Sequence, residues 1–213
     1  MSAGRDVSGR RLYLCTPDRP DLAEFVAACI AGGVDVVQLR EKHLEARALL
    51  ARARLARDVC EAHGVPFVLN DRPDLALEAG ADGVHVGQDD APVSLARRIL
   101  GPDAIVGLST HGADDLAAAA SEDVTYISAG PVEATPTKPG RPGTGPGYAG
   151  VASARSAVPV FVTGGVTPER IPGLVTAGVR HFVVVRYLTQ APDAVVAARV
   201  LRDAIDAALA PAA

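Results

Sequence analysis

The stretch Val34 to Lys42, VDVVQLREK, decides how the rest of the chain is interpreted. Its apolar β-formers predict a buried strand, and the residues where that strand stops are polar: Gln38, Arg40, Glu41 and Lys42. In a parallel α/β fold, ligands bind at this end of the strands. Arg40 and Lys42 are two residues apart, so both cations point the same way on an extended segment and suit a polyanion. Salt bridges to neighbouring glutamates would explain the same pattern, so the other segments must decide.

Alternating strand and helix patterns continue on both sides of this stretch. Further strands are predicted at 11–16, 66–70, 83–87, 104–109, 125–130, 159–164 and 181–186, and most are followed by an amphipathic or alanine-rich helix that ends at glycine. Eight strand-helix units predict an α/β fold, a closed (β/α)8 TIM barrel in a single domain over residues 11–213, after a flexible tail over residues 1–10. A doubly wound open sheet is the alternative, and it explains eight regular units less well.

Composition excludes several classes of protein. The chain has 213 residues, of which 48% are hydrophobic, so a sizeable core is expected. A net charge of −4 argues against nucleic-acid binding, and no apolar run reaches the roughly 18 residues of a membrane span. We therefore expect a soluble, cytoplasmic protein. Cys15, Cys29 and Cys60 lie inside apolar patterns without metal-type spacing, which predicts buried, reduced thiols.

One segment interrupts the regular alternation. Eight of the thirteen residues from Thr135 to Gly147 are glycine or proline, so neither a helix nor a strand is expected to run through it. A flexible linker between domains would have this composition. Its place after the sixth strand favours a ligand-facing lid.

Carboxylates follow two neighbouring strands. Asn70 and Asp71 come after the third strand, and Gln88, Asp89 and Asp90 after the fourth. Mg²⁺ is commonly held by one or two carboxylates with substrate phosphates, which Asp71 and either Asp89 or Asp90 would satisfy. Each group alone would also suit a turn or a helix cap. Together with Arg40 and Lys42, they favour a metal-diphosphate site.

Hydroxyl groups and a lysine follow the next two strands. Ser109 and His111 come after the fifth strand, and Thr135, Thr137 and Lys138 lie in the glycine- and proline-rich segment. No nucleophilic triad is visible, so we interpret Ser109 as a hydrogen-bond donor. His111 is either a base or a structural residue at a helix start, and we favour the second. The other histidines are scattered without metal-ligand spacing, which favours structural or surface roles: His43, His63, His85 and His181.

The last two strands end in TGGVT (163–167) and in Val185-Arg186. In a barrel, the loops after these strands often bind phosphate through backbone N–H groups, and glycine permits the close approach that this requires. The predicted site therefore has two anion-binding regions, one cationic and one made of backbone amides. This arrangement suggests two phosphorylated substrates side by side.

These motifs, in this order, resemble the thiamine-phosphate synthase family. The resemblance runs from about Tyr13 to the last helix through VQLREK (37–42), LND (69–71), HVGQDD (85–90), GLSTH (107–111), ISAGPVEATPTKPG (127–140) and TGGV (163–166). It implies a transferase barrel that uses Mg²⁺ to join 4-amino-2-methyl-5-pyrimidinylmethyl diphosphate to 4-methyl-5-(2-phosphoethyl)thiazole, giving thiamine phosphate and diphosphate.

The resemblance also implies roles for individual residues. Those assigned to the pyrimidine diphosphate are Gln38, Arg40, Lys42, Asn70, Ser109 and Lys138. Those assigned to the thiazole phosphate are Thr135, Thr137, Gly165, Val185 and Arg186, the last three chiefly through the backbone. Leu39, Glu41 and Pro136 are also implied to bind substrate. Asp71 and Asp90 would hold Mg²⁺, so the resemblance selects Asp90 over Asp89. Many relatives carry a small pair where this chain has Arg186-Tyr187, which leaves the Arg186 side chain without an assigned role.

The implied mechanism is dissociative. Mg²⁺, Arg40, Lys42 and Lys138 would neutralise charge on the departing diphosphate, and the thiazole nitrogen would capture a pyrimidinylmethyl cation. Ser109, as a hydrogen-bond donor, completes the implied catalytic residues. The alternatives are a thiazole tautomerase with His111 as acid and base, and a non-catalytic protein that binds phosphate ligands. The expected partners are the small-molecule substrates and a second copy of the chain in a homodimer.

Overall fold

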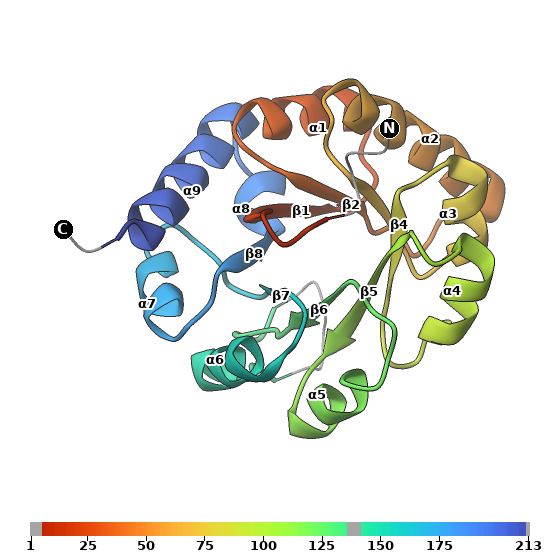
Figure 1. Cartoon of the computed structure of the whole chain (residues 1–213). Helices are drawn as coiled ribbons and strands as arrows, with labels where there is room; N and C mark the ends of the chain where they lie inside the picture. The colour runs from red at the N-terminus through yellow and green to blue at the C-terminus, as the bar shows by residue number, and fades with distance from the viewer. Residues whose placement is uncertain (1–5, 136–141, 212–213) are drawn as a thin grey trace.

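The structure, a computed structural model, describes residues 6–135 and 142–211. Parallel strands pair in sequence order, and the first closes on the last to form a barrel (Figure 1). The strands are β1 (Leu12–Thr16), β2 (Val36–Leu39), β3 (Phe67–Asn70), β4 (Gly83–Val86), β5 (Ile105–Thr110), β6 (Tyr126–Ala129), β7 (Val160–Val162) and β8 (His181–Val184). The predicted (β/α)8 barrel is therefore confirmed, and an open sheet is excluded.

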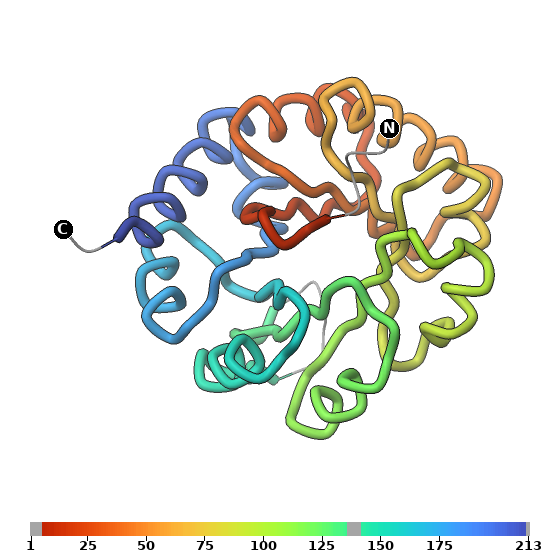
Figure 2. The backbone as a smooth tube through the Cα atoms, in the orientation of Figure 1, coloured from red at the N-terminus to blue at the C-terminus, as the bar shows by residue number. Residues whose placement is uncertain are grey.

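Helices form a ring around the strands (Figure 2). They are α1 (Leu22–Ala31), α2 (Ala46–Ala62), α3 (Pro73–Ala79), α4 (Val93–Leu100), α5 (Ala113–Ala119), α6 (Gly145–Arg155), α7 (Ile171–Thr176), α8 (Arg186–Thr189) and α9 (Ala194–Leu209). Two residues explain the bounds of α3: Pro73 favours a first turn, and Gly80 ends the helix with a φ of 68°.

Two elements differ from the sequence-based expectation. The first turn of α6 is Gly145-Pro146-Gly147, inside the segment expected to exclude helix. The first turn of a helix tolerates proline because its N–H groups have no partner within the helix. The short helix α8 begins at Arg186, where the sequence predicts the end of a strand. Four residues are too few for a periodic pattern to reveal.

Side chains alternate between the inside and the outside of the barrel, and this alternation creates two cores. Outward residues such as Leu14, Leu39 and Phe182 pack with the helices. Inward residues such as Tyr13, Ile105 and Phe161 form a separate cluster that fills the barrel near the strand starts. Further along the strands, the inward positions become polar, so the barrel is filled at one end and lined by polar groups at the other.

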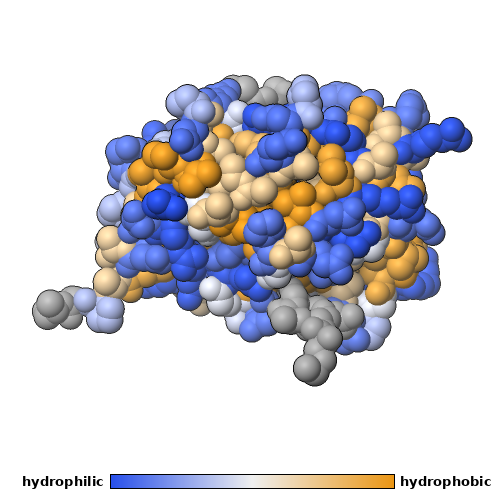
Figure 3. Space-filling view, turned by 90° about the horizontal axis from the view of Figure 1, so that it is seen from above, coloured by the Kyte–Doolittle hydropathy of each residue, from blue (hydrophilic) through white to orange (hydrophobic). Residues whose placement is uncertain are grey.

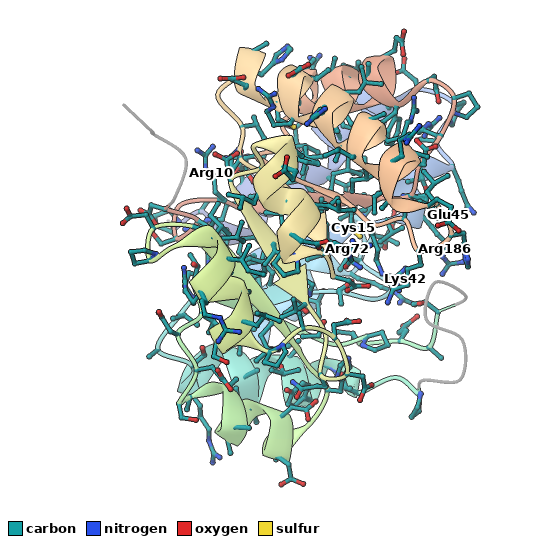
Figure 4. The ribbon with its side chains drawn as sticks, turned by 90° about the vertical axis from the view of Figure 1, so that its right-hand side faces the viewer. Arg10, Cys15, Lys42, Glu45, Arg72 and Arg186 are labelled. Carbon is teal, nitrogen blue, oxygen red and sulfur yellow. The ribbon has the colours of Figure 1, made fainter. Side chains whose placement is uncertain are left out.

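The filled end includes a residue before the first strand. Val7 is only 1% exposed and packs with the inward cluster, and the backbone N–H of Arg10 donates to the carbonyl of Val7. The predicted tail over residues 1–10 is therefore wrong for residues 6–10, because one valine between polar neighbours supplies a buried contact. Figure 4 shows Arg10 at this end and Lys42 at the opposite end.

A histidine at the filled end makes stability depend on pH. Burial lowers the pKa of His181, although the hydrogen bond of its Nδ1 to the Arg10 carbonyl (2.6 Å) opposes this. As pH falls through the unfolded-state pKa of about 6.5, the unfolded chain takes up a proton before the folded protein does. In urea unfolding, we expect the wild type to have a higher free energy of unfolding than His181→Gln at pH 7.5. This difference should become smaller at pH 5.5. A difference that is constant with pH would contradict this.

The remaining composition-based expectations concern cysteines and surface. Cys15, Cys29 and Cys60 are all buried and form no disulfide, as predicted. Among residues 6–135 and 142–211, no helix is both long and apolar enough to cross a membrane. The face seen in Figure 3 carries apolar patches interrupted by polar side chains.

Candidate functional site

A cavity of about 490 Å³ opens at the carboxyl ends of the strands. It exists because the inward positions change from apolar to polar along several strands, as from Val36 to Gln38 on β2 and from Val68 to Asn70 on β3. The predicted site residues that line it are Gln38, Arg40, Lys42, Asn70, Asp71, Asp90, Ser109, Thr135, Gly165, Val185 and Arg186. Residues from seven strand ends thus meet in one space. Figure 4 shows Lys42 and Arg186 at this same end of the barrel.

The charged part of the cavity centres on Asp71. Lys42 Nζ lies 2.7 Å from Asp71 Oδ2. Burial raises the pKa of Asp71, and its hydrogen bond with Asp90 adds to this effect, while Lys42 opposes it. The pKa of Asp90 is lowered despite burial, because Asp71 and the backbone N–H of Gly87 (2.9 Å) both hydrogen-bond to its carboxylate. The two carboxyl groups therefore compete for one proton.

The geometry excludes helix capping as the role of these carboxylates. The N-cap of α3 is Arg72 and that of α4 is Pro92, and neither helix has a side-chain cap hydrogen bond. Asp71 has a φ of 63°, a left-handed conformation that aspartate tolerates better than most residues. Asp90 is half-buried whereas Asp89 is exposed. Both Asp89 and Asp90 line the cavity, so the choice of Asp90 over Asp89 stays a prediction.

Two carboxylates in contact are a donor set suited to a hard divalent cation. In the part of the chain that the structure describes, no group of three or more acidic, histidine or cysteine side chains could hold a metal by itself. Mg²⁺ does not need such a group, since one or two carboxylates suffice when substrate phosphates and water supply the other ligands. Asp71 and Asp90 therefore fit Mg²⁺ that arrives with a phosphorylated ligand.

Neutral amides complete this side of the cavity. Asn70 is 6% exposed, and its buried Nδ2 has no hydrogen-bond partner among residues 6–135 and 142–211. A buried amide without a partner is costly unless a ligand supplies an acceptor. Cys15 Sγ donates to Gln38 Oε1 (2.9 Å), which leaves the amide nitrogen of Gln38 as the group that can donate to a ligand.

The opposite side of the cavity is made largely of backbone. Gly164 and Gly165 follow β7 with φ values of 93° and 75°. A Cβ atom at Gly165 would lie 2.7 Å from Arg170 Nη1 and 3.1 Å from Glu133 Oε2, two groups that form an ion pair. The glycine pair therefore permits a conformation and a packing that a larger residue would disturb, as a backbone phosphate site requires.

Some predicted residues are not brought to the cavity. Leu39 is fully buried among the helices, so its side chain faces away. The side chain of Glu41 accepts from the backbone N–H of His43 (2.7 Å), and Glu41 is absent from the lining. Pro136, Thr137 and Lys138 lie outside the described residues. The same holds for the central part of the predicted lid.

Sequence reasoning missed the floor of the cavity. His85, interpreted as structural or surface, is buried inside the barrel, and its Nε2 lies 2.9 Å from Ser109 Oγ. Tyr13, Tyr126 and Ser128 line the same floor. The signal was the alternation of GVHVG, which places His85 on the inward side between two outward valines. His111 also lines the cavity, with Nδ1 3.0 Å from Asp115 Oδ2.

Comparisons with known proteins agree with this geometry. Residues 12–188 match the family model described as thiamine monophosphate synthase. A thiamine-phosphate synthase from Mycobacterium sp. (strain KMS) is 47% identical over 207 residues, covering 91% of this chain and 92% of its own. One from Mycobacterium bovis (strain BCG / Pasteur 1173P2) is 45% identical over 216 residues, covering 95% and 97%. The solved thiamine phosphate pyrophosphorylase from Pyrococcus furiosus superimposes with a TM-score of 0.85 at 26% identity, covering 94% and 97%.

Proposed function

This chain belongs to the thiamine monophosphate synthase family, and from that premise we propose that its substrates are 4-amino-2-methyl-5-pyrimidinylmethyl diphosphate and 4-methyl-5-(2-phosphoethyl)thiazole. The chain is an enzyme with the activity of a thiamine-phosphate synthase. One observation supports this choice of substrates. The Lys42–Asp71–Asp90 cluster and the backbone site at Gly165 line the same cavity. The two regions suit a diphosphate and a monophosphate.

The diphosphate is bound by the cationic side of the cavity. Arg40 and Lys42 neutralise its charge, and Asn70 Nδ2 supplies the donor that now has no partner. Lys138, predicted for the same role, lies outside the described residues. Ser109, on the cavity floor, donates to an acceptor atom of the same substrate.

Asp71 and Asp90 would hold Mg²⁺. These two carboxylates otherwise compete for one proton, and a divalent cation would favour the ionised form of both. When bound, the metal supplies Lewis-acid stabilisation of negative charge on the diphosphate.

The thiazole phosphate lies on the other side, against the backbone of Gly165 and Val185, with the Thr135 hydroxyl nearby. The exposed Arg186 side chain at the cavity mouth is close enough to line it. The phosphate groups of the two substrates are thus held on opposite sides of the cavity.

The reaction needs little from the protein beyond charge and position. The bond between the pyrimidinylmethyl carbon and the diphosphate oxygen breaks, and its electron pair leaves with diphosphate. The thiazole nitrogen then forms the new C–N bond with its own electron pair. Arg40 and Lys42 stabilise the charge that grows on the leaving group. No general base is required, because the attacking nitrogen carries no proton that must be removed.

The test is diphosphate release by the purified protein given both substrates, with and without Mg²⁺, and given each substrate alone. We expect release only when both substrates and the metal are present. Release without the thiazole would indicate a hydrolase. Isomerisation of a thiazole carboxylate phosphate without any diphosphate release would instead support the tautomerase alternative.

The backbone phosphate site makes a prediction for Gly165. Alanine there imposes a left-handed φ on a residue with a Cβ and displaces the Arg170–Glu133 ion pair. We expect Gly165→Ala to raise the KM for the thiazole phosphate about tenfold, equivalent to about 1.4 kcal/mol, with little change in the KM for the diphosphate. Initial-rate kinetics with each substrate varied in turn measure this.

Gly64→Ala is the matched control. Gly64 also has a positive φ, 65°, but a Cβ there meets nothing within 4 Å, and the residue follows α2 away from the cavity. The Gly64→Ala variant has the same backbone strain as Gly165→Ala but no local clash. Both of its KM values should therefore stay at the wild-type level. Equal effects of the two variants would remove the phosphate assignment.

The predicted homodimer and cytoplasmic location are also part of this proposal. Val196 and Val200 are 57% and 42% exposed and lie one turn apart on α9, an apolar pair that a second copy would cover. The three cysteines, all within the described ranges, are buried free thiols, which suits a reducing compartment.

A further inference from the structure

A row of hydrogen bonds crosses the floor of the cavity, from Tyr13 on β1 to Ser109 on β5. The hydroxyl oxygens of Tyr13 and Tyr126 are 2.8 Å apart. The Tyr126 hydroxyl lies 2.9 Å from His85 Nδ1, and His85 Nε2 lies 2.9 Å from Ser109 Oγ. Ser128 Oγ donates to Ser109 Oγ at 3.4 Å. Every member is buried, so the row connects the apolar core of the barrel to the wall that faces the ligand.

The barrel makes specific room for this row. A Cβ at Gly107 would lie 2.2 Å from Tyr126 Cζ and 2.5 Å from His85 Nδ1. Any larger residue would therefore separate the tyrosine from the histidine. Phe161 packs edge-on against both tyrosines, with centroids 5.3 Å and 5.2 Å away. The two rings thus have fixed positions in an apolar environment.

Counting the protons gives the row a direction. Its first hydroxyl, on Tyr13, is 1% exposed and has Tyr126 as its one hydrogen-bond partner within the described chain. If the row ran from Ser109 toward Tyr13, the Tyr13 O–H would be buried without an acceptor, which is costly. If it runs from Tyr13, every O–H and N–H of the row has an acceptor within it except the O–H of Ser109, and Ser109 lines the cavity where a ligand can supply one. Burial also raises the pKa of both tyrosines, so neither ionises to offer an alternative.

We propose that the buried tyrosine pair, acting through His85, fixes Ser109 as a hydrogen-bond donor to an acceptor atom of the substrate. Tyr126 donates to Nδ1 of His85, so His85 holds its proton on Nε2 and donates it to Ser109 Oγ. Ser109 also accepts from Ser128, so its own O–H points to the ligand. Tyr126 and His85 are positioning residues. The inference extends the proposed function, because it rests on Ser109 binding substrate there.

The direction of the row can be tested without substrate. Two-dimensional ¹H–¹⁵N spectra of the histidine side chains, assigned with His85→Gln, show which ring nitrogen carries the proton. We expect the Nε2–H form of His85 in the wild type and a loss of its dominance in Tyr126→Phe. Tyr13→Phe is the matched control, since it removes a hydroxyl from the same pair but leaves Tyr126 as donor, and it should keep the Nε2–H form. An Nδ1–H form in the wild type would overturn the proposal.

Kinetics then test whether the row acts through Ser109. We expect Ser109→Ala to lower kcat/KM about thirtyfold and Tyr126→Phe about tenfold, whereas the double variant should match Ser109→Ala alone. Independent effects that multiply in the double variant would overturn the positioning role. If no variant or wild type releases diphosphate, the proposed function fails, but the spectra still decide the direction of the row.

Discussion

We expect Asp71→Asn and Asp90→Asn each to lower kcat/KM by about a thousandfold in the presence of Mg²⁺. Such a loss corresponds to about 4 kcal/mol of transition-state stabilisation, the size expected when a metal that neutralises a departing diphosphate is no longer held. Both residues line the cavity, and Asp71 contacts Lys42 at 2.7 Å. Steady-state diphosphate release over a range of Mg²⁺ concentrations measures the effect.

Asp71→Asn should leave the fold intact. Burial and Asp90 raise the pKa of Asp71, so the folded protein holds this carboxylate at a disadvantage. Its replacement by a neutral amide should therefore not lower the free energy of unfolding. Asp89→Asn is the matched control, because Asp89 also lines the cavity but is more exposed than its neighbour Asp90. A normal response to Mg²⁺ in Asp71→Asn or Asp90→Asn, or an equal loss in Asp89→Asn, would remove the metal assignment.

The largest expected effect on stability is that of Gly83→Ala. Gly83 pairs with Ile105 between β4 and β5, and a Cβ at Gly83 would lie 1.9 Å from the carbonyl oxygen of Ile105. Because that atom belongs to the backbone of a closed barrel, a rotamer change cannot relieve the clash. We expect the free energy of unfolding to fall by about 3 kcal/mol or more, measured by urea denaturation.

Gly173→Ala is the control with the opposite sign. Gly173 lies in α7 and is exposed, and a Cβ atom there would meet nothing within 4 Å. Alanine there should raise the free energy of unfolding by about 0.5–1 kcal/mol, since it restricts the unfolded chain and favours helix. A neutral Gly83→Ala would show that β4 and β5 can separate locally without loss of the barrel.

Local signals in the sequence were sufficient for most of the fold. Proline and glycine at the two ends fixed α3, and apolar runs located every strand within a few residues. Val7 was missed because its contacts are with strands far away in the sequence, including Phe161. The helix α8 was missed because four residues are too few to show the hydrophobic periodicity of a helix. These features depend on closure of the barrel, which no local pattern contains.

The residues of the candidate site also fall into two groups, those that local sequence signals predicted and those that they missed. Lys42, Asp71 and the pair Asp89-Asp90 were predicted because charges at strand ends stand out against apolar runs, whereas the choice of Asp90 came from the family resemblance. His85 and Tyr126 were missed because they lie within the strands, where their neighbours are set by pairing across β4, β5 and β6. The meeting of their side chains requires the absent side chain of Gly107 on the strand between them.

The filled end of the barrel, where Val7 and Phe161 are buried, closes that side of the cavity within the described residues. We therefore expect a ligand on the floor beside Ser109 to enter and leave at the carboxyl ends of the strands, where Lys42 and Arg186 lie. The position of each ligand in the cavity should then set the order of binding and release. The deeper substrate binds first, and the deeper product leaves last. Product inhibition should accordingly follow the pattern of a compulsory-order mechanism.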